Sequence, residues 1–409
     1  MPAETLSRKT KFVLYLIMAA TPVLFAEALV RAYFSTQVGP SVLLYGTPWS
    51  RHQEKFDPKG VEMKKAEDES SVAFHQNVTA GYSKYYPSEL LFDRDEFGTR
   101  FTVTINSHGF RGRDFQSAKR PGVIRIVTLG ASSTFGFRSP DHQTYPVFLE
   151  QNLSSALAAR HVNDASAPVT EFEVINLGIP HLTSDQIYAL LAEEGLALKP
   201  DFVTFYEGIN DAAWKEAPDT TTERTKQAVK TVPFANQAFR ALRARLLSVA
   251  LIGSVISDVT TVYSSEDFQD FRKGKRDRFI GNLQRLADLC QKNGIRLIVA
   301  SQSATSLEFK REQLKTLTYS AEQAALRQKL AAGVGLEVGE ADLLIHGELM
   351  DAEREWAIAN EVPYADVIAA MDGSRQNHVT WVHLNAAGNQ VVASVLSEAI
   401  LKELGRKGE

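Results

Sequence analysis

The sequence contains three short polar segments, each directly after an apolar run, and a histidine just before the last helical pattern. The segments are Gly130-Ala-Ser-Ser-Thr-Phe-Gly136, Asn176-Leu-Gly178 and Glu207-Gly-Ile-Asn-Asp211, and the histidine is His383. They supply a serine, a glycine amide, an asparagine amide and an imidazole. A nucleophile, a base and two donors to an oxyanion are the groups that acyl transfer needs.

Two better-known loops do not fit the first segment. A phosphate-binding loop needs a different glycine spacing, and a lysine where this chain has Phe137. A nucleophile elbow needs a glycine two places after its serine, where this chain has Thr134. What remains is a serine on a tight turn beside a helix N-terminus, whose amides stabilise negative charge. Taken alone, a Ser/Thr-rich helix cap explains the segment equally well.

An alternation of strands and helices positions these segments. Apolar runs predict strands over residues 123–129, 172–177, 202–206 and 295–300. Helical periodicity and caps predict helices over residues 145–160, 184–198 and 386–404. Such alternation is typical of an α/β fold with a doubly wound parallel sheet, whose site lies at the carboxyl ends of the strands. We therefore expect the polar segments to converge.

Over about residues 122–409, the order and spacing of these blocks resemble the SGNH hydrolases, the GDSL-type esterase and lipase superfamily, in its bacterial membrane-anchored form. Asn106-Ser-His-Gly-Phe-Arg-Gly112 and Thr144-Tyr-Pro146 agree with that resemblance. The resemblance implies a three-layer α/β/α sandwich with a mostly parallel five-stranded sheet. It implies no metal and no organic cofactor.

The resemblance also implies roles for individual residues. Ser132 is the expected nucleophile and His383 the expected general base. The backbone amides of Ser132 and Gly178, together with the side chain of Asn210, form the expected oxyanion hole.

The chain departs from the family pattern at two places. Gly130-Ala-Ser132 stands in place of Gly-Asp-Ser, and Thr380 stands where the family has an aspartate, three residues before His383. Three outcomes are open at the second place. The Thr380 hydroxyl or a backbone carbonyl accepts a hydrogen bond from His383, or another acid such as Asp372 or Asp211 reaches it. In the third outcome the domain is weakly active or has become a binding module.

The N-terminus carries an apolar run over residues 12–30 in which Glu27 is the only charged residue. As a helix it would be about 28 Å long, close to the thickness of a bilayer. Arg8, Lys9 and Lys11 precede it, which predicts a cytoplasmic N-terminus. We expect a single-pass signal anchor in the inner membrane, with the catalytic domain on the periplasmic or extracytoplasmic side. A cleaved signal peptide and a buried core helix are the alternatives.

These patterns divide the chain into three parts. Residues 1–34 are the expected anchor, and residues 35–121 a linker with a small β-like lead-in. Residues 122–409 form the expected catalytic domain, with helical insertions at about 212–294 and 303–360.

Composition excludes several other classes of protein. The 409 residues include 45 Lys+Arg against 49 Asp+Glu, a net charge of −4 that offers no positive field for nucleic acid. The single cysteine, Cys290, rules out an intramolecular disulfide and a thiolate zinc site. His378 and His383 are five residues apart and lack the spacing of a helical metal pair.

The sequence thus predicts a serine ester hydrolase that acts on an exported acylated substrate, either a glycan or a lipid ester. One alternative is an O-acyltransferase that uses a polysaccharide hydroxyl in place of water. The other is a non-catalytic, membrane-tethered protein for glycan binding or assembly.

Overall fold

The computed structural model describes residues 8–38, 74–77, 82–85, 87–88, 90–163, 171–213, 265–306, 311–333, 336 and 338–405. They belong to two compact units, which are described separately. Most of the predicted linker (39–73) and of the first insertion (214–264) lies outside the described residues.

The described part of the first unit is helix α1 (Arg8–Val38), which includes the apolar run over residues 12–30 and contains Pro22. Over the described residues, no helix has both the length and the apolar character of a membrane span. The predicted anchor is therefore not supported by the structure.

The second unit is built on a five-stranded parallel sheet. Its strand order is β6-β5-β7-β8-β9. The strands are β5 (Val123–Gly130), β6 (Glu171–Asn176), β7 (Phe202–Tyr206), β8 (Arg296–Ala300) and β9 (Tyr364–Ala365). The α/β fold and the four expected strands are confirmed. The fifth strand was not predicted from the residues, because two residues are too few to show a periodic pattern.

Helices connect and cover these strands. They are α4 (Ser132–Phe135), α5 (Tyr145–Asn163), α6 (Ser184–Leu190), α7 (Ile209–Ala212), α11 (Ser265–Lys292), α12 (Arg311–Leu314), α13 (Tyr319–Ala331), α14 (Val338–Ala359), α15 (Val367–Met371) and α16 (Ala386–Gly405). The helix expected over 184–198 is less regular than predicted. After α6 it continues as a π-helical turn (Leu191–Gly195) and a 3-10 turn (Leu196–Leu198). Two further 3-10 turns are Asp141–Gln143 and Arg375–Asn377.

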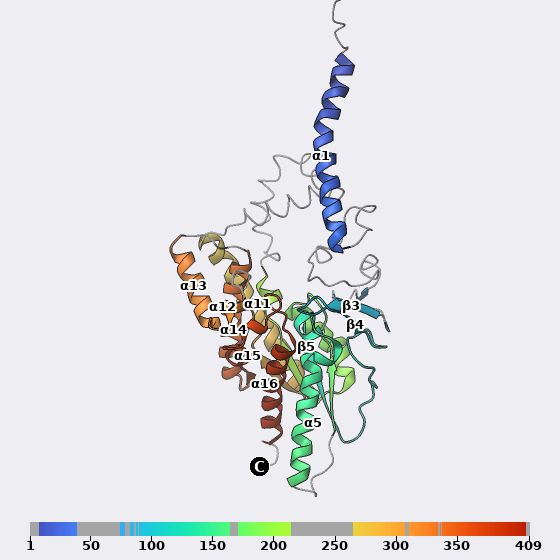
Figure 1. The fold of residues 1–409 in the computed structure, drawn as a ribbon. Coiled ribbons are helices and arrows are strands. Elements are labelled where there is room, and N and C mark those ends of the chain that lie inside the picture. Colours follow the sequence, from blue (N-terminus) through green and yellow to red (C-terminus); the bar gives the residue numbers. More distant parts are fainter. Residues whose placement is uncertain are drawn as a thin grey trace, which may run out of the picture. The chain divides into compact units, whose positions relative to one another are not determined.

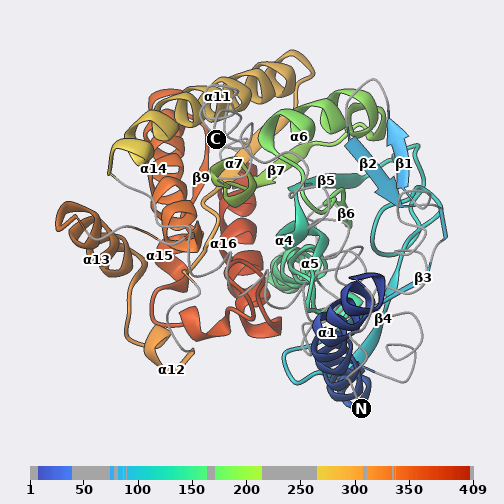
Figure 2. The same cartoon turned by 90° about the horizontal axis from the view of Figure 1, so that it is seen from above.

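The helices form a layer on each face of the sheet (Figures 1 and 2). Helices α5 and α16 lie side by side on one face, and α6, α11 and α14 cover the other. Alternate residues of β5 point into the two layers: Ile126 packs toward α5 and α16, while Val127 and Leu129 belong to the opposite core. A sheet covered on both faces requires apolar residues on both sides of each strand. This explains why apolar residues dominate strands β5, β7 and β8.

Two antiparallel hairpins precede the sheet. They are β1 (Phe74–Asn77) with β2 (Tyr82–Tyr85), and β3 (Leu90–Arg94) with β4 (Arg100–Thr104). Leu91 and Val103 of the second hairpin share a buried cluster with Phe135 and Phe137, which lie three and five residues after the expected nucleophile. The β-like lead-in is therefore packed into the domain that carries the serine.

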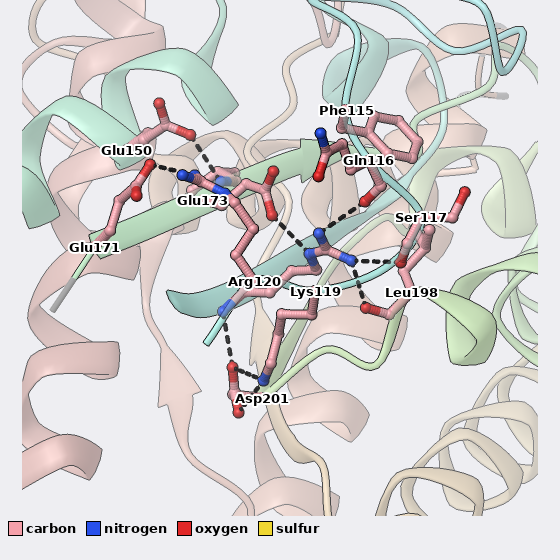
Figure 3. Close-up of polar contacts among 12 residues, drawn as sticks. Phe115, Gln116, Ser117, Lys119, Arg120, Glu150, Glu171, Glu173, Leu198 and Asp201 are labelled. Atoms are coloured by element: carbon pink, nitrogen blue, oxygen red, sulfur yellow. Dashed lines mark hydrogen bonds and ion pairs between the residues drawn. The ribbon is translucent and has the colours of Figure 1, made fainter. Parts of the chain in front are cut away.

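A polar cluster fastens the end of this lead-in to the amino ends of the strands (Figure 3). The Arg125 side chain is buried in β5 and donates to Glu173 Oε2 at 2.6 Å and to Ser117 O at 2.9 Å. Asp201 accepts from Arg125 N at 2.7 Å and from Lys119 Nζ at 2.7 Å. The cluster lies at the end of the sheet opposite the polar segments, which leaves the carboxyl ends of the strands for the site.

Candidate active site

The serine loop (residues 130–136) turns sharply out of β5. A Cβ atom on Gly130 would overlap the Thr134 side chain, so the turn requires glycine. Ser132 is the first residue of α4, and its carbonyl accepts from Gly136 N at 2.8 Å. Gly136 has φ +96°, in the left-handed region that favours glycine. The two glycines hold Ser132 on a compact turn at the carboxyl end of the strand.

The histidine loop (residues 378–385) places His383 against this serine. His383 Nε2 lies 2.9 Å from Ser132 Oγ, although the two residues are 251 positions apart in the chain. The loop is closed on itself, since Val379 N donates to His383 O at 2.7 Å and His378 bridges Leu384. His383 is 8% exposed. The distance between Ser132 and His383 suits direct proton transfer.

Thr380 lies behind His383, on the side away from the serine. Its Oγ1 is 2.8 Å from His383 Nδ1 and accepts from His383 N at 3.0 Å. Of the three outcomes left open by the sequence, the structure shows the first, in which the Thr380 hydroxyl group is hydrogen-bonded to the His383 imidazole.

The two alternative acids are engaged elsewhere. Asp372 Oδ1 accepts from Tyr319 N at 2.8 Å. Asp211 accepts from Ser184 N at 2.8 Å and from Ser184 Oγ at 2.6 Å. Burial raises the pKa of Asp211 to about 6. In the described part of the chain, neither carboxyl group contacts His383.

The surroundings of His383 favour its neutral form. Burial, together with the nearby charges of Arg138, His181 and His378, lowers its pKa to about 3, with burial as the largest cause. The Phe137 ring packs against the imidazole in an edge-to-face arrangement, with the ring centroids 5.4 Å apart. At neutral pH, His383 is therefore a neutral imidazole, which is the form that accepts a proton.

Gly178 lies directly against the serine loop. A Cβ atom on Gly178 would overlap the backbone of Thr134 and Phe135, so only glycine fits between the two loops. Its amide hydrogen is bonded to Asn176 Oδ1 at 2.8 Å. The structure thus brings Gly178 against the serine loop, and it adds an acceptor for its N–H that the sequence did not predict.

Asn210 comes from the asparagine loop (residues 207–211), which follows β7. Its Nδ2 donates to Leu182 O at 3.0 Å, and the amide carries a second hydrogen. Its backbone N donates to Glu207 Oε1 at 2.9 Å. Burial raises the pKa of Glu207 to about 8, so this carboxyl group is protonated at neutral pH.

The lead-in supplies a residue whose role the sequence did not predict. The buried guanidinium of Arg111 donates to Gly136 O at 2.6 Å, Phe135 O at 3.2 Å and Ser139 O at 2.6 Å. It also pairs with Asp141 at 2.9 Å. Arg111 thus holds the backbone that follows Ser132. It lies within the Asn106–Gly112 motif, which was the only signal available from the sequence.

The other histidines near the site differ in their surroundings. His181 is exposed, with φ +68°, and is close enough for its charge to lower the pKa of His383. His378 is buried, and its Nδ1 lies 2.9 Å from Arg375 O, which is a structural contact. Among the described residues, no group of three or more His, Cys, Asp or Glu side chains is arranged to hold a metal ion.

Comparison with known proteins adds a family match. The sequence profile of the GDSL-like lipase/acylhydrolase family matches residues 128–391. No curated protein sequence matches the chain.

Several solved structures are similar to this chain. The acetyl xylan esterase AlAXEase is 16% identical, with 68% of this chain and 100% of that chain covered and a TM-score of 0.38. The lipase/acylhydrolase from Enterococcus faecalis is 15% identical, with 68% of this chain and 95% of that chain covered and a TM-score of 0.38. The native aryl esterase of M. smegmatis is 13% identical, with 68% of this chain and 99% of that chain covered and a TM-score of 0.37. Because these identities and scores are low, membership of a family rests on the sequence profile.

Proposed function

Because the chain belongs to the GDSL-like lipase/acylhydrolase family and is an ester-bond hydrolase, we propose that it cleaves its substrate through an acyl-enzyme formed on Ser132. The observation that carries the proposal is the distance of 2.9 Å between Ser132 Oγ and His383 Nε2. An imidazole kept neutral by burial, with a hydroxyl group on its other nitrogen, supports the role of His383 as general base.

In the first half of the reaction, Ser132 Oγ attacks the ester carbonyl carbon while its proton passes to His383 Nε2. The carbonyl π electrons move onto oxygen and form a tetrahedral oxyanion. As the intermediate collapses, the C–O bond to the alcohol breaks, and the leaving alkoxide takes the proton from His383. Water then attacks the acyl-enzyme with His383 again as base, which releases the carboxylic acid and returns the proton to Ser132.

The oxyanion donors are part of the proposal. We propose that the Ser132 amide donates one hydrogen bond, and that the Asn210 side chain donates another with the hydrogen that is not bonded to Leu182 O. The Gly178 N–H must share its hydrogen between Asn176 Oδ1 and the oxyanion, or leave Asn176 as the intermediate forms. We therefore assign Gly178 a weaker contribution than the other two donors.

A fluorophosphonate probe tests the nucleophile directly. Attack by a serine Oγ on phosphorus expels fluoride and leaves a stable phosphonyl-serine. We expect labelling of the wild type and of Ser397→Ala, a matched change at a buried serine on α16. Ser132→Ala should not be labelled. A folded wild-type protein that does not react would refute the proposal.

The hydrolase is favoured over a non-catalytic binding protein by the contact between Thr380 Oγ1 and His383 Nδ1, which supports a working Ser-His dyad. We propose that the substrate is an acylated glycan or lipid. If a sugar hydroxyl replaced water, the same acyl-enzyme would make the protein an O-acyltransferase. Measuring released acid against acylated sugar, with an oligosaccharide present, separates the two activities.

The exported location and the anchor over residues 12–30 stay predictions. They rest on the basic residues before that apolar run. Protease digestion of intact spheroplasts tests the location: the catalytic domain should be degraded from outside, and protection of the domain would contradict the prediction.

A further inference from the structure

Gln302 lies at the centre of the site, yet no sequence motif marks it. It follows β8 and is 0% exposed. Its Oε1 accepts from Ile209 N at 2.8 Å, and its Nε2 donates to Ser133 Oγ at 3.1 Å. The Gln302 amide thus joins the asparagine loop to the serine loop.

The same network reaches the histidine loop. Ser133 Oγ, which accepts from Gln302, donates to Val382 O at 3.3 Å. Ile209, Ser133 and Val382 each directly adjoin a residue with a proposed chemical role, namely Asn210, Ser132 and His383.

The hydrogen-bond pattern permits only one orientation of the Gln302 amide. Ile209 N–H can only donate, so it must face the amide oxygen. The amide nitrogen then donates to Ser133 Oγ, whose own hydrogen points at Val382 O. A flipped amide would set two donors against each other in a buried place, where an unsatisfied polar group is costly. The network therefore specifies both positions and directions.

A further contact joins the segment just after the serine loop to the histidine loop. Ser139 Oγ donates to Leu384 O at 3.0 Å. It does not include the asparagine loop, whereas the Gln302 network connects all three loops.

We propose that Gln302 is a positioning residue, which sets Ser132, His383 and Asn210 relative to one another through Ser133 and Ile209. The proposal rests on the proposed function of that site. Without the amide, Ile209 N and Ser133 Oγ lose their buried partners, and the three loops are free to shift. Proton transfer across 2.9 Å is sensitive to such shifts, whereas substrate binding is less so.

The test is the kinetics of Gln302→Leu with p-nitrophenyl acetate. We expect kcat to fall about 10- to 100-fold with KM changed less than about 2-fold, the pattern of an interaction needed in the transition state. The matched control is Gln323→Leu. Gln323 is also buried, lies on α13 and donates to Leu343 O at 2.6 Å, away from the three loops. Its replacement should lower the melting temperature without a selective loss of kcat.

Ser133→Ala gives an independent arm if Gln302→Leu does not fold. It removes only a hydroxyl group, and we expect the same loss of kcat with little change in KM. Because both residues act through one network, their effects should not add: the kcat of the double variant should lie within about 2-fold of the lower of the two single-variant kcat values. Additive losses, wild-type kcat in Gln302→Leu, or equal losses in Gln302→Leu and Gln323→Leu would overturn the proposal.

The fluorophosphonate probe separates this proposal from the proposed function. If the wild type is labelled and Gln302→Leu reacts at the same rate, the positioning role is wrong and the serine hydrolase stands. If the folded wild type is not labelled, the proposed function itself fails.

Discussion

Replacing Thr380 by valine is the sharpest test of how the site works without the usual aspartate. Valine keeps the shape of the side chain and removes the hydroxyl group. When Ser132 gives its proton to Nε2, His383 becomes an imidazolium whose Nδ1–H needs an acceptor, and Thr380 Oγ1 lies 2.8 Å away. A hydrogen bond to a charged group contributes about 1.5–3 kcal/mol. The loss should therefore reduce kcat about 10- to 150-fold.

The assay is p-nitrophenyl acetate hydrolysis, with Thr380→Ser as the matched control because serine keeps the hydroxyl group. We expect Thr380→Ser to retain most of the wild-type kcat. A Thr380→Val protein that folds and keeps its kcat within about 3-fold would refute the reasoning, since the hydroxyl group would then contribute nothing to the imidazolium.

Restoring the acid should have the opposite effect. The hydroxyl group of Thr380 can accept from Nδ1–H or donate to a bare Nδ1, so it tolerates both tautomers of His383, whereas a carboxylate only accepts and selects the tautomer whose Nε2 is a base. The backbone N–H groups of His383 and Val382, at 3.0 Å and 3.4 Å from Thr380 Oγ1, also suit a carboxylate. We expect Thr380→Asp to raise kcat at pH 7 by about 10-fold or more.

The pH profile of the same pair checks the electrostatics. His383 must be neutral to act as base, and its pKa is lowered to about 3, so wild-type kcat/KM should lose activity only as the pH falls toward 3. A carboxylate at position 380 favours the imidazolium and should move this acid limb upward by about 1–3 pH units. An acid limb near pH 6.5 in the wild type would contradict the lowering of the His383 pKa by burial.

Three further changes probe the surroundings of the site. Gly178→Ala forces a Cβ atom into the backbone of Phe135, so kcat should fall about 100-fold while circular dichroism shows a folded protein; unchanged kcat would mean that the two loops are not in contact. Arg111→Leu removes the guanidinium that donates to three backbone carbonyls, and urea unfolding should show the free energy of unfolding reduced by about 3 kcal/mol; a reduction below about 1 kcal/mol would make that contact network unimportant. Glu207 has a pKa raised from 4.5 to about 8, so the folded protein holds a proton that the unfolded chain releases, and stability should decrease as the pH rises from about 4.5 to 8. Glu207→Gln should flatten that dependence in unfolding experiments at pH 5 and pH 8, and an equally steep dependence in the variant would assign the effect to another group.

Much of the architecture could be predicted because it is encoded locally. The strands β5, β7 and β8 are dominated by apolar residues and β6 has apolar residues on both faces, since the sheet is buried on both faces, and each strand is long enough to be recognised. By contrast, β9 has two residues and forms only because β8 offers a free edge to pair with. Pairing with a distant strand leaves no local pattern in so short a segment.

The site shows the same division. Ser132, Gly178 and Asn210 were candidates because each lies just after a predicted strand, and His383 because it lies just before the last predicted helix. Their individual roles were expected from the family resemblance. Thr380 is recognisable in the sequence as a departure from the family pattern, but its contact with His383 Nδ1 depends on how residues 378–385 fold.

The sequence alone determined which chemical groups the protein carries and at which strand ends they lie. Only the tertiary structure decided which atom faces which. Ser132 Oγ faces His383 Nε2, the Asn176 side chain accepts from the Gly178 N–H, and the Gln302 amide links three loops. The reason is geometric. A hydrogen bond depends on distances held within tenths of an ångström between segments as far as 251 residues apart. Those distances are set by the packing of helices on both faces of the sheet, which no local pattern encodes.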